Sequence, residues 1–276
     1  MTQTQQQTQS PQRLDPITSA PSAAGGFVWH DLMTTDLPRA VEYYTRLLGW
    51  TTHVVEIGAG DSYTMIRAGG TDIGGVVRLD PALGIASHWI GYATVDDVDA
   101  ACERAVALGG AVCVPASDIP DAGRFAVIAD PDGAIVSPFR SVRDEAAERA
   151  THIVGTFCWN ELLTRDPDAV AGFYEGVFGW SYHATDMGPS GTYWLFRRGE
   201  ADAAGMMRMP ADATARPFWM PYVAVDDVDA AAGQAAELGG SIFVAPADIP
   251  GVGRFTVTGD PTGATIALFR GTISDE

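Results

Sequence analysis

The chain has 276 residues, of which 46% are hydrophobic and 19% are charged, and this composition is typical of a soluble globular protein with two domains. Its formal net charge of −18 argues against binding to nucleic acid or to anionic membranes, because both require basic patches. No apolar run reaches the roughly 18–20 residues that a membrane-spanning helix needs. We therefore expect neither a nucleic-acid partner nor a membrane partner.

The first 26 residues are rich in Gln, Thr, Ser and Pro, a composition that predicts a disordered tail. They contain no apolar segment of the kind found in secretory signals. The three cysteines, Cys102, Cys113 and Cys158, form no C-x-x-C motif. An odd, unpatterned set of cysteines suits a reducing compartment, so we expect a cytoplasmic protein.

Most of the remaining chain consists of two copies of one sequence repeat. Residues 27–140, laid on residues 157–270 at an offset of 130, give 43 identical residues in 114, and the likeness is clearest between Val95–Phe125 and Val225–Phe255. A repeat this long indicates two whole globular modules. We predict one domain over 27–140, a second over 157–270, and a linker at 141–156 whose charged, Ala-rich composition favours a short helix.

Each copy carries the same series of predicted elements. Alternating apolar residues predict a first strand, a capping aspartate (Asp36 or Asp166) begins a helix, and Gly49 or Gly179 ends it. Three strands follow, and after a loop the scheme restarts with a strand, a helix that Asp96 and Asp97 cap, and three more strands. In the first copy the predicted elements are 27–34, helix 37–48, 50–57, 62–68, 73–79, 89–95, helix 98–108, 111–115, 124–129 and 134–140.

Several short motifs accompany this βαβββ pattern. An aromatic-rich helix ends at Gly-Trp (Gly49-Trp50 and Gly179-Trp180), and V-D-D-V-D-A-A, L-G-G and D-P-x-G-A each occur in both copies. Together they resemble the vicinal oxygen chelate superfamily, which includes glyoxalase I, bleomycin-resistance proteins and extradiol dioxygenases. The resemblance implies an α+β fold with two tandem modules, each built of paired βαβββ units that form a partly open mixed β-barrel flanked by helices.

The resemblance also places the residues that bind metal in the metal-using members. In this chain those positions hold Trp29, Val77, Ile90 and Ser137 in the first copy and Trp159, Met207, Met220 and Ala267 in the second. None of these side chains is a good ligand for a divalent metal, so we expect neither a metal nor another cofactor. A register shift of one or two residues would instead bring in His30, Asp31, Glu161 or His88.

Strand alternation predicts what lines the interior of each barrel. Side chains two residues apart share a face, and the face that includes Trp29 and Asp31 is predicted to point inward. The predicted inward set is Trp29, Asp31, Met33, His88, Ile90, Tyr92 and Thr94 in the first copy and Trp159, Glu161, Leu163, Phe218, Met220, Tyr222 and Ala224 in the second. Such a wall is typical of a small-molecule pocket. The alternative is that the aromatic side chains only fill the barrel.

Asp31 and Glu161 are the candidate catalytic residues. A carboxylate among bulky apolar neighbours loses solvation, which raises its pKa and suits it to act as a general base. The alternative is a structural carboxylate that backbone N–H groups or an arginine satisfy. The candidate ligand-binding residues are Trp29, Trp159, Tyr63, Tyr193, His88, Tyr92 and Tyr222. His88 becomes Phe218 in the second copy, and a solvated loop histidine is the alternative for it.

Three functions remain open from the sequence. The first is a metal-independent, glyoxalase-like lyase, isomerase or hydroxylase that acts on a small carbonyl or aromatic compound. The second is a protein that sequesters such a compound without chemistry, and the third is an interaction scaffold without a ligand. Each copy can close its own barrel, so we expect a monomer, with a homodimer through exposed sheet edges as the alternative.

Overall fold

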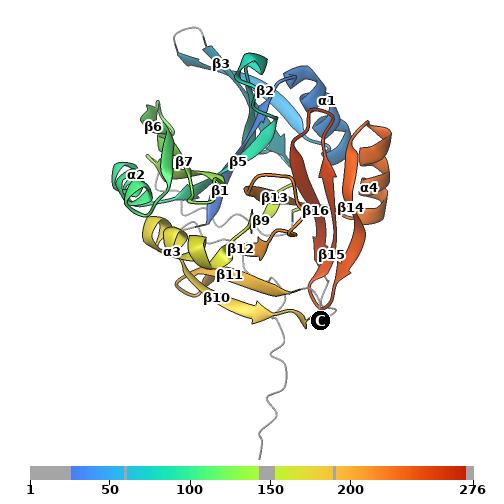
Figure 1. Ribbon diagram of the computed structural model, residues 1–276. Helices are drawn as coiled ribbons and strands as arrows, with labels where there is room; N and C mark the ends of the chain where they lie inside the picture. Colours follow the sequence, from blue (N-terminus) through green and yellow to red (C-terminus); the bar gives the residue numbers. More distant parts are fainter. Residues whose placement is uncertain (1–25, 59–60, 143–152, 189–190, 272–276) are drawn as a thin grey trace, which may run out of the picture.

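The computed structural model describes residues 26–58, 61–142, 153–188 and 191–271, and each copy of the repeat forms one curled sheet of eight strands (Figure 1). The first copy, module one, contains β1 (Phe27–Thr34), α1 (Leu37–Leu48), β2 (Thr51–Gly58), β3 (Asp61–Ala68), β4 (Thr71–Arg78), a 3-10 turn η1 (Pro81–Leu83), β5 (His88–Thr94), α2 (Val98–Ala107), β6 (Ala111–Ile119), β7 (Gly123–Ala129) and β8 (Ile135–Ser141). The α+β fold with two tandem modules is confirmed.

The second copy, module two, repeats this order with the omission of the 3-10 turn. It contains β9 (Phe157–Thr164), α3 (Pro167–Phe178), β10 (Ser181–Asp186), β11 (Thr192–Arg198), β12 (Ala201–Arg208), β13 (Phe218–Ala224), α4 (Val228–Glu237), β14 (Ser241–Ile249), β15 (Gly253–Gly259) and β16 (Thr265–Gly271). None of the helices in the described residues is long and apolar enough to cross a membrane.

Two βαβββ units join at the centre of each sheet. The strand order in module one is β2-β3-β4-β1-β5-β8-β7-β6, in which β1 and β5 are antiparallel neighbours, β1 is parallel to β4 and β5 is parallel to β8. Module two has the corresponding order, β10-β11-β12-β9-β13-β16-β15-β14. The first strands β1 and β9 therefore lie in the middle of their sheets, where their side chains are surrounded on both sides.

Local sequence sets the helix ends, as predicted. The Asp36 side chain accepts a hydrogen bond from the backbone N–H of Arg39 at 3.2 Å, and Gly49 ends the helix in the left-handed conformation, with φ of 67°. Asp97, rather than Asp96, caps α2 by accepting from the N–H of Ala100 at 3.0 Å. These caps satisfy backbone groups that the first and last helical turns leave unpaired.

The predicted strand 111–115 is too short. β6 continues to Ile119 and β14 to Ile249, although Pro115 and Pro246 lie inside them. Both are edge strands, and a proline is tolerated there because the missing N–H would face away from the neighbouring strand. The predicted linker helix falls mainly on residues 143–152, which lie outside the described residues.

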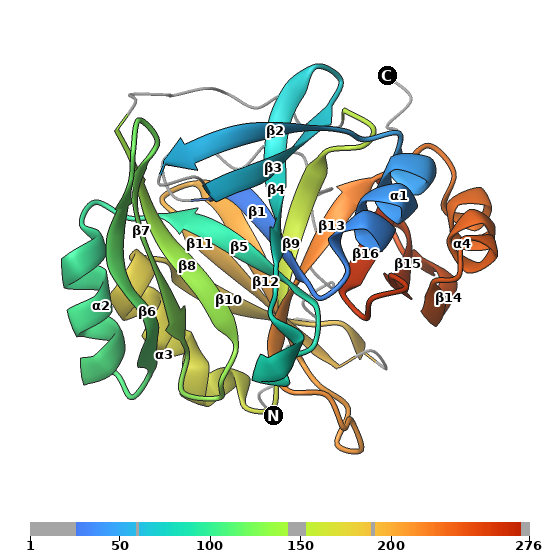
Figure 2. The ribbon, with the colours of Figure 1, turned by 90° about the horizontal axis from the view of Figure 1, so that it is seen from above.

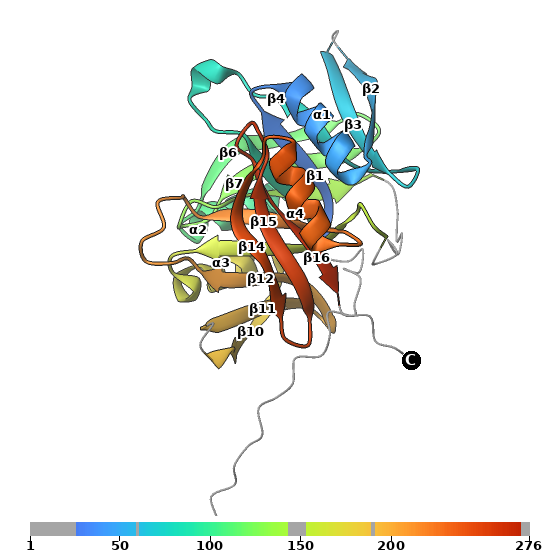
Figure 3. The same ribbon diagram turned by 90° about the vertical axis from the view of Figure 1, so that its right-hand side faces the viewer.

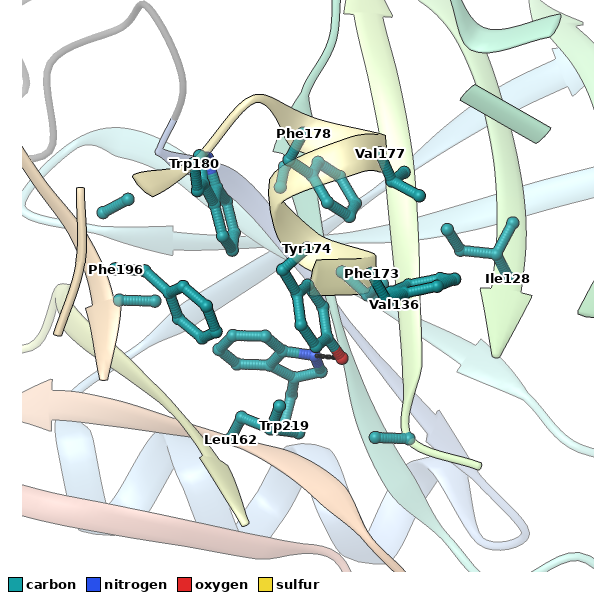
Figure 4. Packing of buried hydrophobic residues seen from close by; sticks show 14 of the residues in the cluster. Ile128, Val136, Leu162, Phe173, Tyr174, Val177, Phe178, Trp180, Phe196 and Trp219 are labelled. Atoms are coloured by element: carbon teal, nitrogen blue, oxygen red, sulfur yellow. Dashed lines mark hydrogen bonds between the residues drawn. The ribbon is translucent and has the colours of Figure 1, made fainter. Parts of the chain in front are cut away.

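The two modules pack against each other through their helices. α1 lies beside α4 and α2 beside α3, and the two helix pairs lie on opposite sides of the molecule (Figures 2 and 3). One shared core combines Val98, Ala101 and Ala105 of α2 with aromatic residues of module two. Figure 4 shows part of this core, in which Ile128 and Val136 of module one lie near Phe173 of α3. The helix-facing sides of the central strands, which carry Leu32 and Leu162, are therefore buried between the modules, whereas the edge strands β6, β10 and β14 stay largely exposed.

A polar pair lies at the junction of the modules. The imidazole Nε2 of His30 lies 2.7 Å from Oδ1 of Asn160, the equivalent residue in the second copy, and the His30 ring stacks on Phe157 with centroids 3.9 Å apart. This contact crosses the pseudo-symmetric interface, because the helix-facing sides of β1 and β9 meet there.

Removing the hydroxyl of Tyr174 is expected to weaken the contact between the modules. This hydroxyl donates to Oδ2 of Asp130 in module one at 2.8 Å and accepts from Nε1 of Trp219 at 3.0 Å, and all three side chains are buried. Tyr174→Phe leaves both partners short of a hydrogen bond and should lower the free energy of unfolding by about 1–3 kcal/mol in urea titrations. Tyr182→Phe, at a residue that is 43% exposed, is the control and should change it by less than about 0.5 kcal/mol. Equal changes in the free energy of unfolding for Tyr174→Phe and Tyr182→Phe would contradict the role of the Tyr174 hydroxyl in joining the modules.

Candidate functional site

The inner face of each sheet carries the predicted side chains. In module one, Trp29 and Met33 pack with Ile90 and Tyr92 in one apolar cluster, whereas Leu32 lies on the opposite side in the core shared with α1 and α4. In module two, Trp159, Met220 and Tyr222 form the corresponding cluster. The predicted alternation along β1, β5, β9 and β13 is confirmed.

Asp31 lies at the centre of the inner face of module one and accepts three hydrogen bonds from side chains. The indole Nε1 of Trp29 donates to Oδ1 at 3.0 Å, the hydroxyl of Tyr92 donates to Oδ2 at 2.8 Å, and the hydroxyl of Tyr63 donates to Oδ1. Trp29 Nε1 also lies 2.9 Å from the Tyr63 hydroxyl. Tyr63 is 34 positions from Trp29, and Tyr92 is 61 positions from Asp31. Side chains from distant parts of the chain thus meet around the Asp31 carboxylate, and Asp31 is only 5% exposed.

Module two repeats the constellation around Glu161. The hydroxyl of Tyr222 donates to Oε1 of Glu161 at 3.0 Å, and Nε1 of Trp159 donates to the hydroxyl of Tyr193 at 3.0 Å, while Tyr193 also hydrogen bonds to Glu161. All four side chains stand 130 positions after their counterparts in module one. We call these two groups the Asp31 cluster and the Glu161 cluster.

Burial changes the acidity of both carboxyl groups. Desolvation raises the pKa of Asp31, against the opposing effect of its three hydrogen bonds. It raises the pKa of Glu161 to about 7, opposed by the hydrogen bonds from Tyr222 and Tyr193. A carboxyl group with a pKa near neutrality can both accept and release a proton at physiological pH. The expected raised pKa is therefore present at both positions.

Two glycines make the clusters possible, and the sequence analysis missed them. Gly75 pairs with Asp31 across β4 and β1, and Gly205 pairs with Glu161 across β12 and β9. A Cβ atom at either glycine would lie 1.8 Å from the hydroxyl oxygen of Tyr63 or Tyr193. The signal was present in the sequence, because a glycine inside a strand often marks a close approach and this one is kept in both copies.

His88 is the one predicted site residue that does not join a cluster. It is the first residue of β5 and lies half-buried at the rim of the inner face, where its Nδ1 is 2.8 Å from the carbonyl oxygen of Ala86. Its position opposite Met33 in the β1–β5 pairing places it at the same rim.

Arg124 and Arg254 belong to structural clamps outside the inner faces. Arg124 binds Asp118 at 2.8 Å and also forms a two-pronged ion pair with Asp99 on α2. Arg254 does the same with Asp248 and Asp229. Both guanidinium groups are occupied by carboxylates and fix the β6–β7 and β14–β15 hairpins to their helices.

The residues at the family's metal positions do not fit a metal. Trp29 presents an N–H donor to Asp31 instead of a lone pair, and the hydroxyl of Ser137 is buried and donates to the carbonyl oxygen of Ala126 at 2.6 Å. The Asp31 carboxylate is not one of these positions, and it already accepts three hydrogen bonds from neighbouring side chains. Across residues 26–58, 61–142, 153–188 and 191–271, no three His, Cys, Asp or Glu side chains gather closely enough to hold a metal ion.

Comparison with known proteins identifies the family. The model of the glyoxalase/bleomycin resistance protein/dioxygenase superfamily matches residues 26–137 and 149–268. The chain belongs to this superfamily. Two of its relatives are named "Putative glyoxylase CFP32" and come from Mycobacterium bovis and Mycobacterium tuberculosis; each is 39% identical over 245 residues, which cover 88% of this chain and 93% of the relative. The anthracycline biosynthesis protein DnrV of Streptomyces peucetius is 34% identical, with 89% and 93% covered.

Solved structures of superfamily members share the fold. The 2,2',3-trihydroxybiphenyl 1,2-dioxygenase of Sphingomonas wittichii strain RW1 matches with a TM-score of 0.60 at 14% identity, covering 92% of this chain and 93% of that one. The Mn(II)-bound glyoxalase of Novosphingobium aromaticivorans matches with a TM-score of 0.57 at 16% identity, covering 90% and 82%. At such low identities the likeness establishes only the fold. The reaction has to be argued from the side chains of this protein.

Proposed function

We propose that this superfamily member binds a small aromatic or carbonyl compound on an inner face and transfers a proton on it without a metal, as an isomerase or lyase. The carboxylate of Asp31 or Glu161 is the general base. The observation that carries the proposal is the pair of clusters, in each of which a buried carboxylate with a raised pKa lies under apolar and aromatic side chains.

The surroundings of the carboxylates suit removal of a proton next to a carbonyl group. Such a proton is weakly acidic, and a desolvated carboxylate with a raised pKa is a stronger base than one in water. The hydroxyls of Tyr63 and Tyr92 each have one proton, which they donate to Asp31; once Asp31 has accepted a proton from the substrate, these hydroxyls can turn to donate to an oxygen on which negative charge develops. Hydroxylation, the third expected reaction, needs an oxidant as well as a base, so we restrict the proposal to proton transfer.

The names of the relatives support the same classes of compound. A glyoxylase acts on small carbonyl compounds, and anthracyclines are polycyclic aromatic ketones and quinones. Flat rings would stack on the indole and phenyl side chains of an inner face, which favour aromatic partners.

Sequestration without chemistry is the second candidate. It is favoured by the Asp31 cluster, in which both carboxylate oxygens already accept hydrogen bonds and which could serve as a rigid wall for a stacked ligand. Neither a free base nor turnover is needed for this function.

Deuterium exchange separates the two candidates. We expect the wild-type protein in D2O to catalyse exchange of the C–H protons next to the carbonyl of α-tetralone or methylglyoxal, measured by mass spectrometry against a protein-free blank. Whichever of Asp31→Asn and Glu161→Gln removes the base should lower this rate by about 10²–10⁴-fold, while the ligand still raises the melting temperature. Binding without exchange would support sequestration. If the protein showed no binding and no exchange, the proposal would be contradicted and the interaction scaffold would be favoured.

A further inference from the structure

The two inner faces differ in exposure although they are built from equivalent residues. In module two, Trp159 and Phe269 are 6% and 7% exposed and belong to an apolar cluster in which Leu163, Phe218 and Phe255 are partly buried. Their counterparts in module one, Trp29 and Phe139, are only partly buried. The inner face of module one thus leaves aromatic surface open to solvent, which is the usual mark of a binding surface.

Two substitutions between the copies account for the difference. Val252, in the turn between β14 and β15, is 7% exposed and packs into the inner cluster of module two. Its counterpart, Ala122, has only a methyl group and is partly exposed, outside the cluster of module one. Similarly, Phe218 packs against the cluster of module two, where module one has His88 at the rim. Larger apolar side chains cover more of the inner face of module two, and smaller or polar ones cover less of the inner face of module one.

His88 supplies a hydrogen-bond acceptor at this open face. A carbonyl oxygen can only accept, so the 2.8 Å contact with Ala86 places the proton of the neutral imidazole on Nδ1. Nε2 then carries a lone pair. Because His88 and Ile90 share the inner side of β5, the imidazole is about 7 Å along the strand from the residue that pairs with Asp31. That spacing is close to the length of a fused two-ring compound.

We propose that the ligand binds on the inner face of module one, and that the more covered inner face of module two does not bind it. The ligand is a flat aromatic compound with a hydroxyl group, and Nε2 of His88 accepts a hydrogen bond from that hydroxyl. The ligand's rings lie on Trp29, Phe125 and Phe139. This inference rests on the proposed function and deepens it by naming the module, the ligand class and a residue that determines specificity.

Equilibrium dialysis with 2-naphthol tests the choice of module. The wild type is expected to bind one molecule per chain. Ala122→Val should weaken binding by at least about tenfold by giving module one the closing side chain of module two, and Val252→Ala should add a second site. Trp29→Leu should weaken binding, and the matched Trp159→Leu should not. Denaturation curves establish that each variant is folded.

The role of His88 is tested with a second probe, 2-methoxynaphthalene, which has the same rings but no hydroxyl proton. His88→Phe should weaken 2-naphthol binding by about threefold to tenfold and leave 2-methoxynaphthalene unchanged. Equal losses for both probes would overturn the hydrogen bond. Naphthol binding that responds to Trp159→Leu but not to Ala122→Val or Trp29→Leu would overturn the choice of module and leave the proposed function intact. No binding to the wild type would contradict both.

Discussion

We expect the free energy of unfolding of the wild-type protein to fall between about pH 4.5 and pH 7 because Glu161 ionises. In Glu161→Gln this contribution to the pH dependence should be absent. Burial raises the pKa of Glu161 from its ordinary value of 4.5 to about 7 in the folded protein. The folded state therefore holds the proton more tightly than the unfolded state does. The stability that this contributes is fully present below pH 4.5 and is lost as the pH rises through 7.

The expected size of this effect is about 3 kcal/mol, because each unit of pKa corresponds to ~1.4 kcal/mol. It is measured as the difference between the urea unfolding free energies of the wild type and Glu161→Gln at pH 5 and at pH 8. Other titrating groups are the same in both proteins and cancel. The wild type should lose stability relative to the variant over this range. A difference that does not change with pH would show that Glu161 is not desolvated.

Replacing Gly205 with alanine is expected to destabilise the protein by about 2–4 kcal/mol. The new methyl group would lie 1.8 Å from the hydroxyl oxygen of Tyr193 and 2.5 Å from its ring carbon, so the ring has to leave its place. The variant then loses the hydrogen bonds of Tyr193 with Trp159 and Glu161 in addition to suffering strain. Gly75→Ala should act in the same way on Tyr63 in module one.

Gly233→Ala is the matched control. Gly233 lies in α4 on an exposed side, and a Cβ atom there would meet no atom within 4 Å. Alanine is the better helix former, so this change should stabilise the protein by about 0.5–1 kcal/mol. Chemical denaturation of the three variants gives the comparison. Equal effects at Gly205 and Gly233 would contradict the close contact that defines the Glu161 cluster.

Much of the site could be predicted from the sequence because it depends on strand alternation. The positions of Trp29, Asp31 and Tyr92 on one face follow from a period of two within β1 and β5. Because the second copy repeats the first at an offset of 130 residues, the same prediction applies to the inner face of module two without any further assumption. The helix caps at Asp36 and Asp97 were predictable for a similar reason, since they depend on a few neighbouring residues.

Features that depend on contacts between distant strands could not be predicted in the same way. That Tyr63 reaches Asp31 over Gly75 depends on the register of three strands, which no local pattern contains. The pairing of His30 with Asn160 depends on how the modules pack, and the closing of module two by Val252 depends on the path of a turn. His88 was predicted on the same strand face as Ile90 and Tyr92, but only the structure shows its contact with the carbonyl oxygen of Ala86 and its absence from the described cluster.

The most direct test of the central claim is the electron density on the inner face of module one, in crystals of protein purified without chelator and soaked with 2-naphthol. We predict an aromatic molecule stacked on Trp29, with the indole nitrogen still hydrogen bonded to Asp31. A metal ion coordinated by inner-face side chains, or naphthol bound only to module two, would contradict the account.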